Sequence, residues 1–252
     1  MEAGTLKITA VQARRTEKSE ALDTVRSILS NISSDIVVFP EKWVTGEFTE
    51  EELIGALDGV DKDHIPFFVP GSFSIRDGTS LYNRSYLFHY GKMVGYQDKI
   101  SLYADEPRKY RSGSSVKIFT GGGLSIGLPI CYDIDFPYYV KVLMRSGCNI
   151  VINPSLIRSD FVEEWHLYIS ARSLENRVPV ISVNSLSDPF GGNSIAVTPY
   201  RDGNGFRIRK TISHDLVFDA LLDPADYEEG RQKRYGEDPG IYSFQNVENV
   251  KF

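Results

Sequence analysis

The sequence predicts an α/β fold in which strand hairpins are mixed with crossover helices. Short continuous apolar runs, such as residues 36–39 and 149–152, are typical of strands buried on both faces of a sheet. Longer segments, such as residues 17–32 and 160–177, carry apolar residues at helical spacing. Because no linker, repeat or low-complexity stretch divides the chain, we expect residues 1–252 to form one domain.

The first half of the chain predicts paired strands around one helix. Residues 6–12 alternate apolar and polar side chains, as a half-buried strand does, and the helix predicted over 17–32 follows. The apolar strand 36–39 then ends at Pro40-Glu41, which places a carboxylate at the carboxyl edge of a sheet, where α/β folds bind ligands. Further strands are predicted at 67–69, 86–90 and 92–97, the last two joined as a hairpin.

The second half alternates strands and helices more regularly. A hairpin around Gly121 to Gly123 leads into an apolar strand, residues 124–130. The remaining strands are predicted at 149–152, 180–184, 194–198 and 216–222, and the helices at 137–145, 160–177 and 224–233. The glycine run lies between two strand-like segments, which favours a turn over a phosphate-binding loop.

Composition and charge exclude several classes of function. A net charge of −6 gives no basic surface for nucleic acid, and we expect none as a partner. No apolar run approaches the roughly 20 residues that a membrane span needs, and the first ten residues lack a signal-peptide core. Two cysteines without an export signal favour a reduced, cytoplasmic protein. Zinc-like spacings, a Walker loop and a dinucleotide fingerprint are missing from the sequence, so we expect neither a metal nor a cofactor.

The segment 127–137 carries the strongest chemical signal. The strand predicted at 124–130 ends on Cys131, directly before a predicted helix. This location puts a thiol at the edge of a sheet, where a nearby helix N-terminus would favour the thiolate. A lone cysteine is more often a buried core residue. We interpret Cys148, which opens a strand, in that structural sense.

Three strand ends now carry Glu41, Lys99 and Cys131, in that order. Their surroundings are Pro40-Glu41, Tyr96-Gln97-Asp98-Lys99 and Ile130-Cys131-Tyr132-Asp133. These segments resemble the three signature motifs of the nitrilase superfamily, the carbon–nitrogen hydrolases, and the resemblance covers most of the chain. It implies a four-layer α-β-β-α sandwich whose protomers form a homodimer or a higher homo-oligomer. It also implies that a helix common between residues 48 and 67 is trimmed here.

The resemblance also implies the catalytic roles. Cys131 would be the nucleophile, Glu41 the base that takes its proton, and Lys99 the ammonium that stabilises the oxyanion. The backbone N–H of Tyr132 would be a second oxyanion donor. Glu106 matches a further family glutamate, which would hold the lysine or the substrate in register. Each charged residue has a plain alternative as a solvated surface group.

Four residues are expected to bind substrate: Tyr132, Glu47, Asn153 and Trp165. Asn153 lies in the family-like segment 153–155, and Trp165 has helix packing as its alternative. Glu47 follows Glu41 on the same loop and would pair with a cationic group of the substrate. Its alternative is membership of an acidic cluster at a helix start, where carboxylates suit the helix dipole.

The leading functional hypothesis is hydrolysis of a small linear amide or carbamoyl compound through a cysteine thioester, with water as the second substrate. A nitrilase is the nearest rival, because the same three residues serve both reactions. Transfer of the acyl group to another acceptor is a third option. A non-catalytic binding or scaffold protein is the rival from another class. The intact set of Glu41, Lys99 and Cys131 argues against that, since a scaffold needs no buried charge pair beside a thiol.

Overall fold

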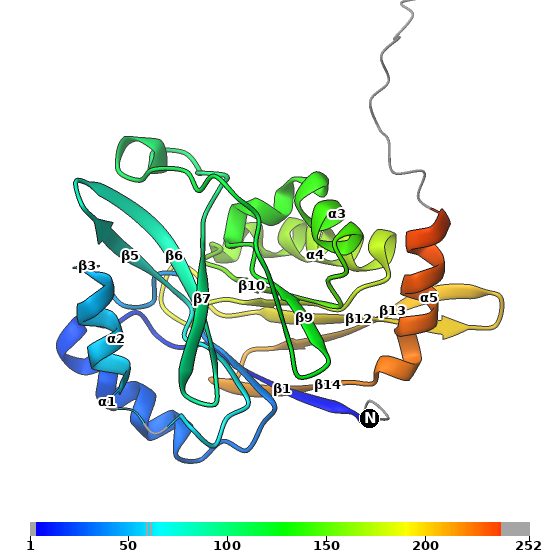
Figure 1. Cartoon of the computed structure of the whole chain (residues 1–252), viewed down its shortest axis with the longest axis horizontal. Helices are drawn as coiled ribbons and strands as arrows, with labels where there is room; N and C mark the ends of the chain where they lie inside the picture. Colours follow the sequence, from blue (N-terminus) through cyan, green and yellow to red (C-terminus); the bar gives the residue numbers. More distant parts are fainter. Residues whose placement is uncertain (1–3, 59, 61, 238–252) are drawn as a thin grey trace, which may run out of the picture.

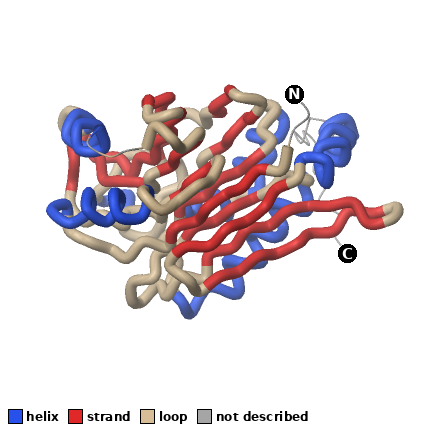
Figure 2. The backbone as a smooth tube through the Cα atoms, turned by 90° about the horizontal axis from the view of Figure 1, so that it is seen from below, coloured by secondary structure: helices blue, strands red, loops and turns tan. Residues whose placement is uncertain are grey.

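Two β-sheets lie face to face, with helices on both outer faces (Figures 1 and 2). The computed structural model describes residues 4–58, 60 and 62–237. This arrangement confirms the α/β class and the four-layer α-β-β-α sandwich. Within the described residues, no helix is both long enough and apolar enough to cross a bilayer.

The first sheet has eight strands, in the order β14-β1-β2-β4-β6-β5-β3, with β7 paired to β6. Its strands are β1 (Leu6–Val11), β2 (Ile36–Val38), β3 (Glu47–Phe48), β4 (Phe67–Val69), β5 (Ser72–Asp77), β6 (Ser80–His89), β7 (Lys92–Asp98) and β14 (Val217–Leu222). The centre is parallel, because β1, β2 and β4 run in one direction, whereas β14 and β6 pair antiparallel.

The second sheet has six strands, in the order β13-β12-β11-β10-β9-β8. They are β8 (Ile118–Gly121), β9 (Leu124–Gly127), β10 (Ile150–Pro154), β11 (Val180–Val183), β12 (Ser194–Asp202) and β13 (Gly205–Ser213). Strands β9, β10 and β11 are parallel, and antiparallel strands complete both edges.

The helices divide between the two outer faces. Apolar side chains of α1 (Lys18–Leu29) and α2 (Glu50–Asp58) pack on the first sheet. Those of α3 (Pro137–Arg145) and α4 (Val162–Asn176) pack on the second sheet. The last helix, α5 (Pro224–Glu237), lies beside α4 and β12. Three short 3-10 turns complete the set: η1 (Glu106–Arg108), η2 (Cys131–Asp135) and η3 (Ser159–Phe161).

Strand β2 shows why the predicted buried strands are apolar without interruption. Ile36 and Val38 point into the core between the sheets. Val37 points the other way, into the layer of α1 and α2. Both faces of the strand are therefore covered, and every position needs an apolar side chain.

Several predictions at the element level need correction. The strand predicted over 124–130 stops at Gly127, because its ladder with β10 ends there and the chain turns toward Cys131. Strands β3, β5 and β13 were not predicted, since polar residues interrupt their apolar pattern. The expectation that a family helix is trimmed between residues 48 and 67 stays a prediction; α2 forms nine residues of helix there.

Candidate active site

Cys131 stands at a sharp turn between β9 and α3. Its backbone φ is 45°, in the left-handed region that non-glycine residues seldom occupy, and it is the first residue of η2. The carboxylate of Asp133 holds this turn by accepting the backbone N–H of Ile130 at 3.0 Å. It also accepts the N–H groups of Ile100 at 3.1 Å and Ser101 at 2.6 Å, which follow Lys99. One buried carboxylate therefore fixes the nucleophile turn to the loop of the lysine.

Glu41 lies next to the thiol and is almost wholly buried, with 1% of its surface exposed. Its Oε1 atom accepts hydrogen bonds from Asn83 Nδ2 at 2.7 Å and from Lys99 Nζ at 3.0 Å. The Cys131 thiol is hydrogen-bonded to the same carboxylate. The Glu41 backbone N–H donates to the carbonyl of Ser155 at 3.2 Å, which joins the ends of the two sheets.

Lys99 follows the end of β7 and reaches two carboxylates. Its Nζ atom lies 3.0 Å from Glu41 Oε1 and 2.8 Å from Glu106 Oε2. Burial alone would lower the pKa of Lys99, but the negative charges of Glu41 and Glu106 outweigh it and raise the pKa. The side chain is therefore a buried ammonium, as an oxyanion donor has to be.

The Glu106 carboxylate lies between two cations, Lys99 and Lys42. Its Oε1 atom accepts from Lys42 Nζ at 2.6 Å, and Oε2 also accepts the Tyr103 N–H at 2.9 Å. Burial would raise the pKa of Glu106, but Lys99 and Lys42 overcome it and lower the pKa to about 2. The structure thus brings the four predicted catalytic residues together. Lys42 had no predicted role, and its only signal in the sequence was its adjacency to Glu41.

The Cys131 thiol is neutral in this arrangement. Burial and the Glu41 carboxylate raise its pKa, while Lys99 and a hydrogen bond to the Leu156 backbone act in the opposite direction without overcoming them. The expectation that a nearby helix N-terminus favours the thiolate stays a prediction, and any such effect is outweighed here. Burial dominates because removing a thiolate from water costs more than one neighbouring ammonium returns.

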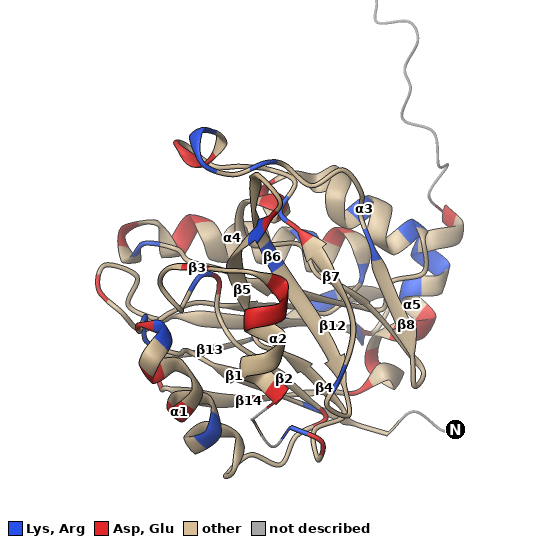
Figure 3. Ribbon diagram, turned by 60° about the vertical axis from the view of Figure 1, so that its left-hand side comes forward, with Lys and Arg blue, Asp and Glu red and all other residues tan. Residues whose placement is uncertain are grey.

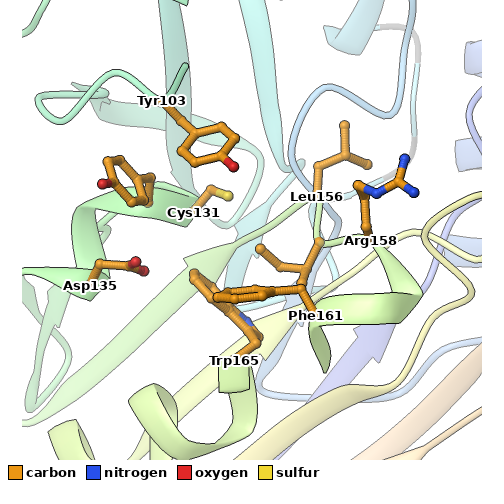
Figure 4. A pocket seen from close by; sticks show the side chains of 9 residues that line it. Tyr103, Cys131, Asp135, Leu156, Arg158, Phe161 and Trp165 are labelled. Carbon is orange, nitrogen blue, oxygen red and sulfur yellow. The ribbon is translucent and has the colours of Figure 1, made fainter. Parts of the chain in front are cut away.

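A cavity of about 150 Å³ opens beside the thiol (Figure 4). Its walls are Tyr103, Cys131, Tyr132, Asp135, Leu156, Ile157, Arg158, Phe161 and Trp165. Tyr132 and Trp165 were both expected at the substrate, and both border the cavity. A hydrogen bond of 2.9 Å from Nε1 to Ser182 Oγ fixes the Trp165 ring. The ring therefore has both roles, as part of the packing of α4 and as a wall of the cavity.

Asn153 and Glu47, also expected at the substrate, are not among the cavity walls. Asn153 Nδ2 donates to the carbonyl oxygens of Pro129 at 2.9 Å and Cys131 at 3.3 Å. These two hydrogen bonds stabilise the turn that carries the nucleophile. Glu47 is ion-paired with Arg76 and lies 3.6 Å from Lys109 Nζ. It precedes the acidic first turn of α2, shown in red in Figure 3, as its alternative assignment required.

Three further residues of the site had no predicted role. Asn83 contacts the Glu41 carboxylate, and its segment 82–85 was recognised only as a family landmark. Asp133 holds the nucleophile turn, and Asp135 borders the cavity. Both aspartates lie in the segment 127–137 around the nucleophile, but no spacing rule separates a structural carboxylate from one that faces substrate.

Known proteins share this fold and sequence pattern. The profile described as carbon–nitrogen hydrolase matches residues 7–202. A "Hydrolase in agr operon" of Staphylococcus lugdunensis is 26% identical over 224 residues, which cover 81% of this chain and 94% of that protein. The 2-oxoglutaramate amidase of Bacillus subtilis (strain 168) is 28% identical over 184 residues, covering 66% of this chain and 71% of the relative. A crystal structure of a carbon–nitrogen hydrolase from Helicobacter pylori G27 has a similar fold, with a TM-score of 0.79, 15% identity, and 97% and 98% of the two chains covered.

Proposed function

Because this chain belongs to the carbon–nitrogen hydrolase family and acts on C–N bonds other than peptide bonds, we propose that it hydrolyses a small linear amide or carbamoyl compound through a thioester on Cys131. One observation carries the proposal. The Lys99 ammonium contacts both Glu41 and Glu106, and Glu41 is hydrogen-bonded to the thiol. A base and an ammonium group thus lie together beside a nucleophile that borders the cavity.

In the first half of the reaction, Glu41 takes the proton of the Cys131 thiol as the sulfur attacks the amide carbonyl. The negative charge that forms on the carbonyl oxygen is stabilised by the Lys99 ammonium. The N–H of Tyr132 is the second donor, because the first N–H groups of a helical turn have no acceptor within it. The C–N bond then breaks, Glu41 returns its proton to the nitrogen, and ammonia or an amine leaves.

In the second half, water cleaves the thioester. Glu41 accepts a proton from the water as its oxygen attacks the acyl carbon, and the same two donors hold the oxyanion. The C–S bond breaks, the sulfur regains a proton from Glu41, and the carboxylic acid departs. Glu106 acts through Lys99, which it holds at 2.8 Å, and is therefore a positioning residue.

The proposal is tested by measuring ammonia release from small aliphatic amides and their matched nitriles. Wild type should release ammonia from an amide, while Cys131→Ala and Glu41→Gln should fall by at least about 1,000-fold, since both remove a group that acts in the chemical step. Release from nitriles alone would replace the amidase assignment by the nitrilase one. Turnover that survives Cys131→Ala would overturn the mechanism.

A further inference from the structure

Asp135 places a carboxylate at the substrate cavity beside the nucleophile. Figure 4 shows its oxygens, the Cys131 sulfur and the Trp165 ring bordering the same space. The Oδ1 atom is buried and, among the described residues, has no hydrogen-bond partner. Buried polar atoms are nearly always paired, so an unpaired carboxylate atom on a residue that lines the cavity indicates a partner that arrives with the substrate.

The two arginines near Asp135, Arg172 and Arg158, form their hydrogen bonds and ion pairs with groups other than its carboxylate. Arg172 donates from Nε to the carbonyl of Ile134 at 2.8 Å and from Nη2 to the backbone carbonyl of Asp135 at 2.5 Å. Its Nη1 atom lies 3.4 Å from Glu175. Arg158, at the cavity wall, pairs with Asp160 at 3.0 Å. The Asp135 side chain is therefore not the ion-pair partner of either guanidinium.

Among the described residues around the thiol, carboxylates outnumber lysine ammonium groups. The ammonium groups of Lys42 and Lys99 pair with Glu106 and Glu41, at 2.6 Å and 3.0 Å. Two further carboxylates lie in the segment of the nucleophile: Asp133, which accepts three backbone N–H groups, and Asp135, which lines the cavity. A substrate that brings a positive charge would reduce this excess of negative charge, whereas an anionic substrate would increase it.

The other cavity walls suit a cation as well. Tyr103, Tyr132, Phe161 and Trp165 surround the space, and the first two rings pack edge to face with centroids 5.0 Å apart. Aromatic faces attract ammonium groups. A cavity near 150 Å³ accepts a molecule about the size of benzene, which limits the acyl part to a few carbon atoms.

Burial raises the pKa of Asp135 to about 6, with Arg172 and Lys99 acting in the opposite direction. The carboxylate is thus ionised at neutral pH, but it bears a desolvation cost. An ammonium group held against it would offset that cost.

We propose that Asp135 determines substrate specificity by binding a protonated amine, located a few bonds from the scissile carbonyl, through its carboxylate. The inference rests on the proposed amidase function and names its substrate class, a short amino-amide. It assigns to Asp135 the cation recognition that the sequence analysis assigned to Glu47.

Binding without turnover tests the specificity by itself. Isothermal titration calorimetry compares 3-aminopropanamide with butanamide, its uncharged match, in Cys131→Ala. The ammonium compound should bind about 10- to 100-fold more tightly, the effect of one hydrogen bond to a charged group. In Cys131→Ala/Asp135→Asn this preference should fall to within about threefold, because the asparagine keeps the shape and loses the charge. Cys131→Ala/Glu47→Gln is the matched control and should keep the preference.

Each result decides the matter. The proposal is overturned if the two amides bind equally, if neither binds, or if the preference survives Asp135→Asn. A preference that is lost in Glu47→Gln would assign the recognition of the cation to Glu47. Ammonia release by wild type decides the amidase function separately. Hydrolysis of butanamide without a cation preference would refute the specificity and leave the function intact. A cation preference in binding, together with no turnover of any amide, would support the specificity and refute the amidase function.

Discussion

The Cys131 thiol starts the reaction as a neutral group, and its proton can move only to a base that is already in contact. Glu41 is that base, since it is hydrogen-bonded to the thiol and held by Asn83 and Lys99. Coupling the proton transfer to the attack avoids forming an isolated thiolate in a buried site. The resting enzyme therefore keeps a low thiolate fraction and depends on the substrate to draw the proton away.

Limited alkylation should distinguish the two cysteines. Cys131 borders the cavity and is 7% exposed, whereas Cys148 is fully buried, donates to the Ile150 carbonyl at 3.1 Å, and has a pKa that burial raises to about 12. We expect iodoacetamide to modify Cys131 first and to abolish activity in parallel, as peptide mapping would show. Modification of Cys148 first, with activity retained, would contradict the site.

Glu106 should make stability depend on pH. Its folded-state pKa of about 2 lies below the usual 4.5, so the ionised carboxylate stabilises the fold above about pH 4.5. This contribution is lost as the pH falls from about 4.5 toward 2. Glu106→Gln should therefore be less stable than wild type to urea at pH 7, and the difference should shrink markedly at pH 3. A difference that is equal at both pH values would contradict the assigned ion pairs.

At the scale of elements, the site is assembled from loops that leave separate strands. Glu41 follows β2, Lys99 follows β7, and Cys131 follows β9. Asp133 is the link between two of these loops, through its three backbone N–H partners. The geometry of the site therefore depends on one side chain that takes no part in the chemistry.

Asp133→Ala should remove this link. Its three N–H partners, one buried and two partly buried, would lose their acceptor at a cost of about 1–3 kcal/mol for a buried group and less where water can replace it, so we expect a loss of about 3 kcal/mol in unfolding free energy. Turnover should fall as well, because Lys99 and Cys131 lose their common support. Asp105→Ala, which removes an exposed aspartate paired with Arg108, is the control and should change stability by less than about 0.5 kcal/mol. Equal stability of the two variants would refute the role of Asp133.

The apolar elements were predictable from sequence, and the polar ones were not. The buried strand 67–69 and the helix 137–145 were predicted with the bounds that the structure shows. Strand β13 has an exposed, charged pattern, and only its pairing with β12 makes it a strand. The positions of Glu41, Lys99 and Cys131 followed from strand ends. The cavity walls depend on how distant loops pack, which no local pattern encodes, and this is why Asp135 was missed.

At the scale of the molecule, the outer face of α3 and α4 carries exposed apolar side chains. Tyr138 and Val142 lie one turn apart on α3, and Leu167 and Leu174 lie two turns apart on α4. Large apolar patches at a protein surface commonly mark interfaces, and symmetric dimers are the commonest assemblies. We propose that two copies of the chain pair through this face.

Light scattering tests the pairing. At micromolar concentration we expect a mass near twice the 28.4 kDa of one chain. Leu167→Glu should shift the protein toward the monomer without unfolding it, because a charge would be buried at the interface. Leu221→Glu, at a similarly exposed leucine on β14, should not. A wild-type mass of one chain, or dissociation caused by Leu221→Glu alone, would contradict this interface.

The central claim is that the acyl group of the substrate passes through Cys131. Rapid mixing of the enzyme with excess amide, an acid quench and peptide mass spectrometry measure this directly. The account predicts that the peptide containing Cys131 gains the mass of the acyl group less one hydrogen, that hydroxylamine removes it, and that Cys131→Ala never acquires it. An enzyme that releases ammonia while Cys131 stays unmodified throughout turnover, or that carries the acyl group on another residue, would contradict the account.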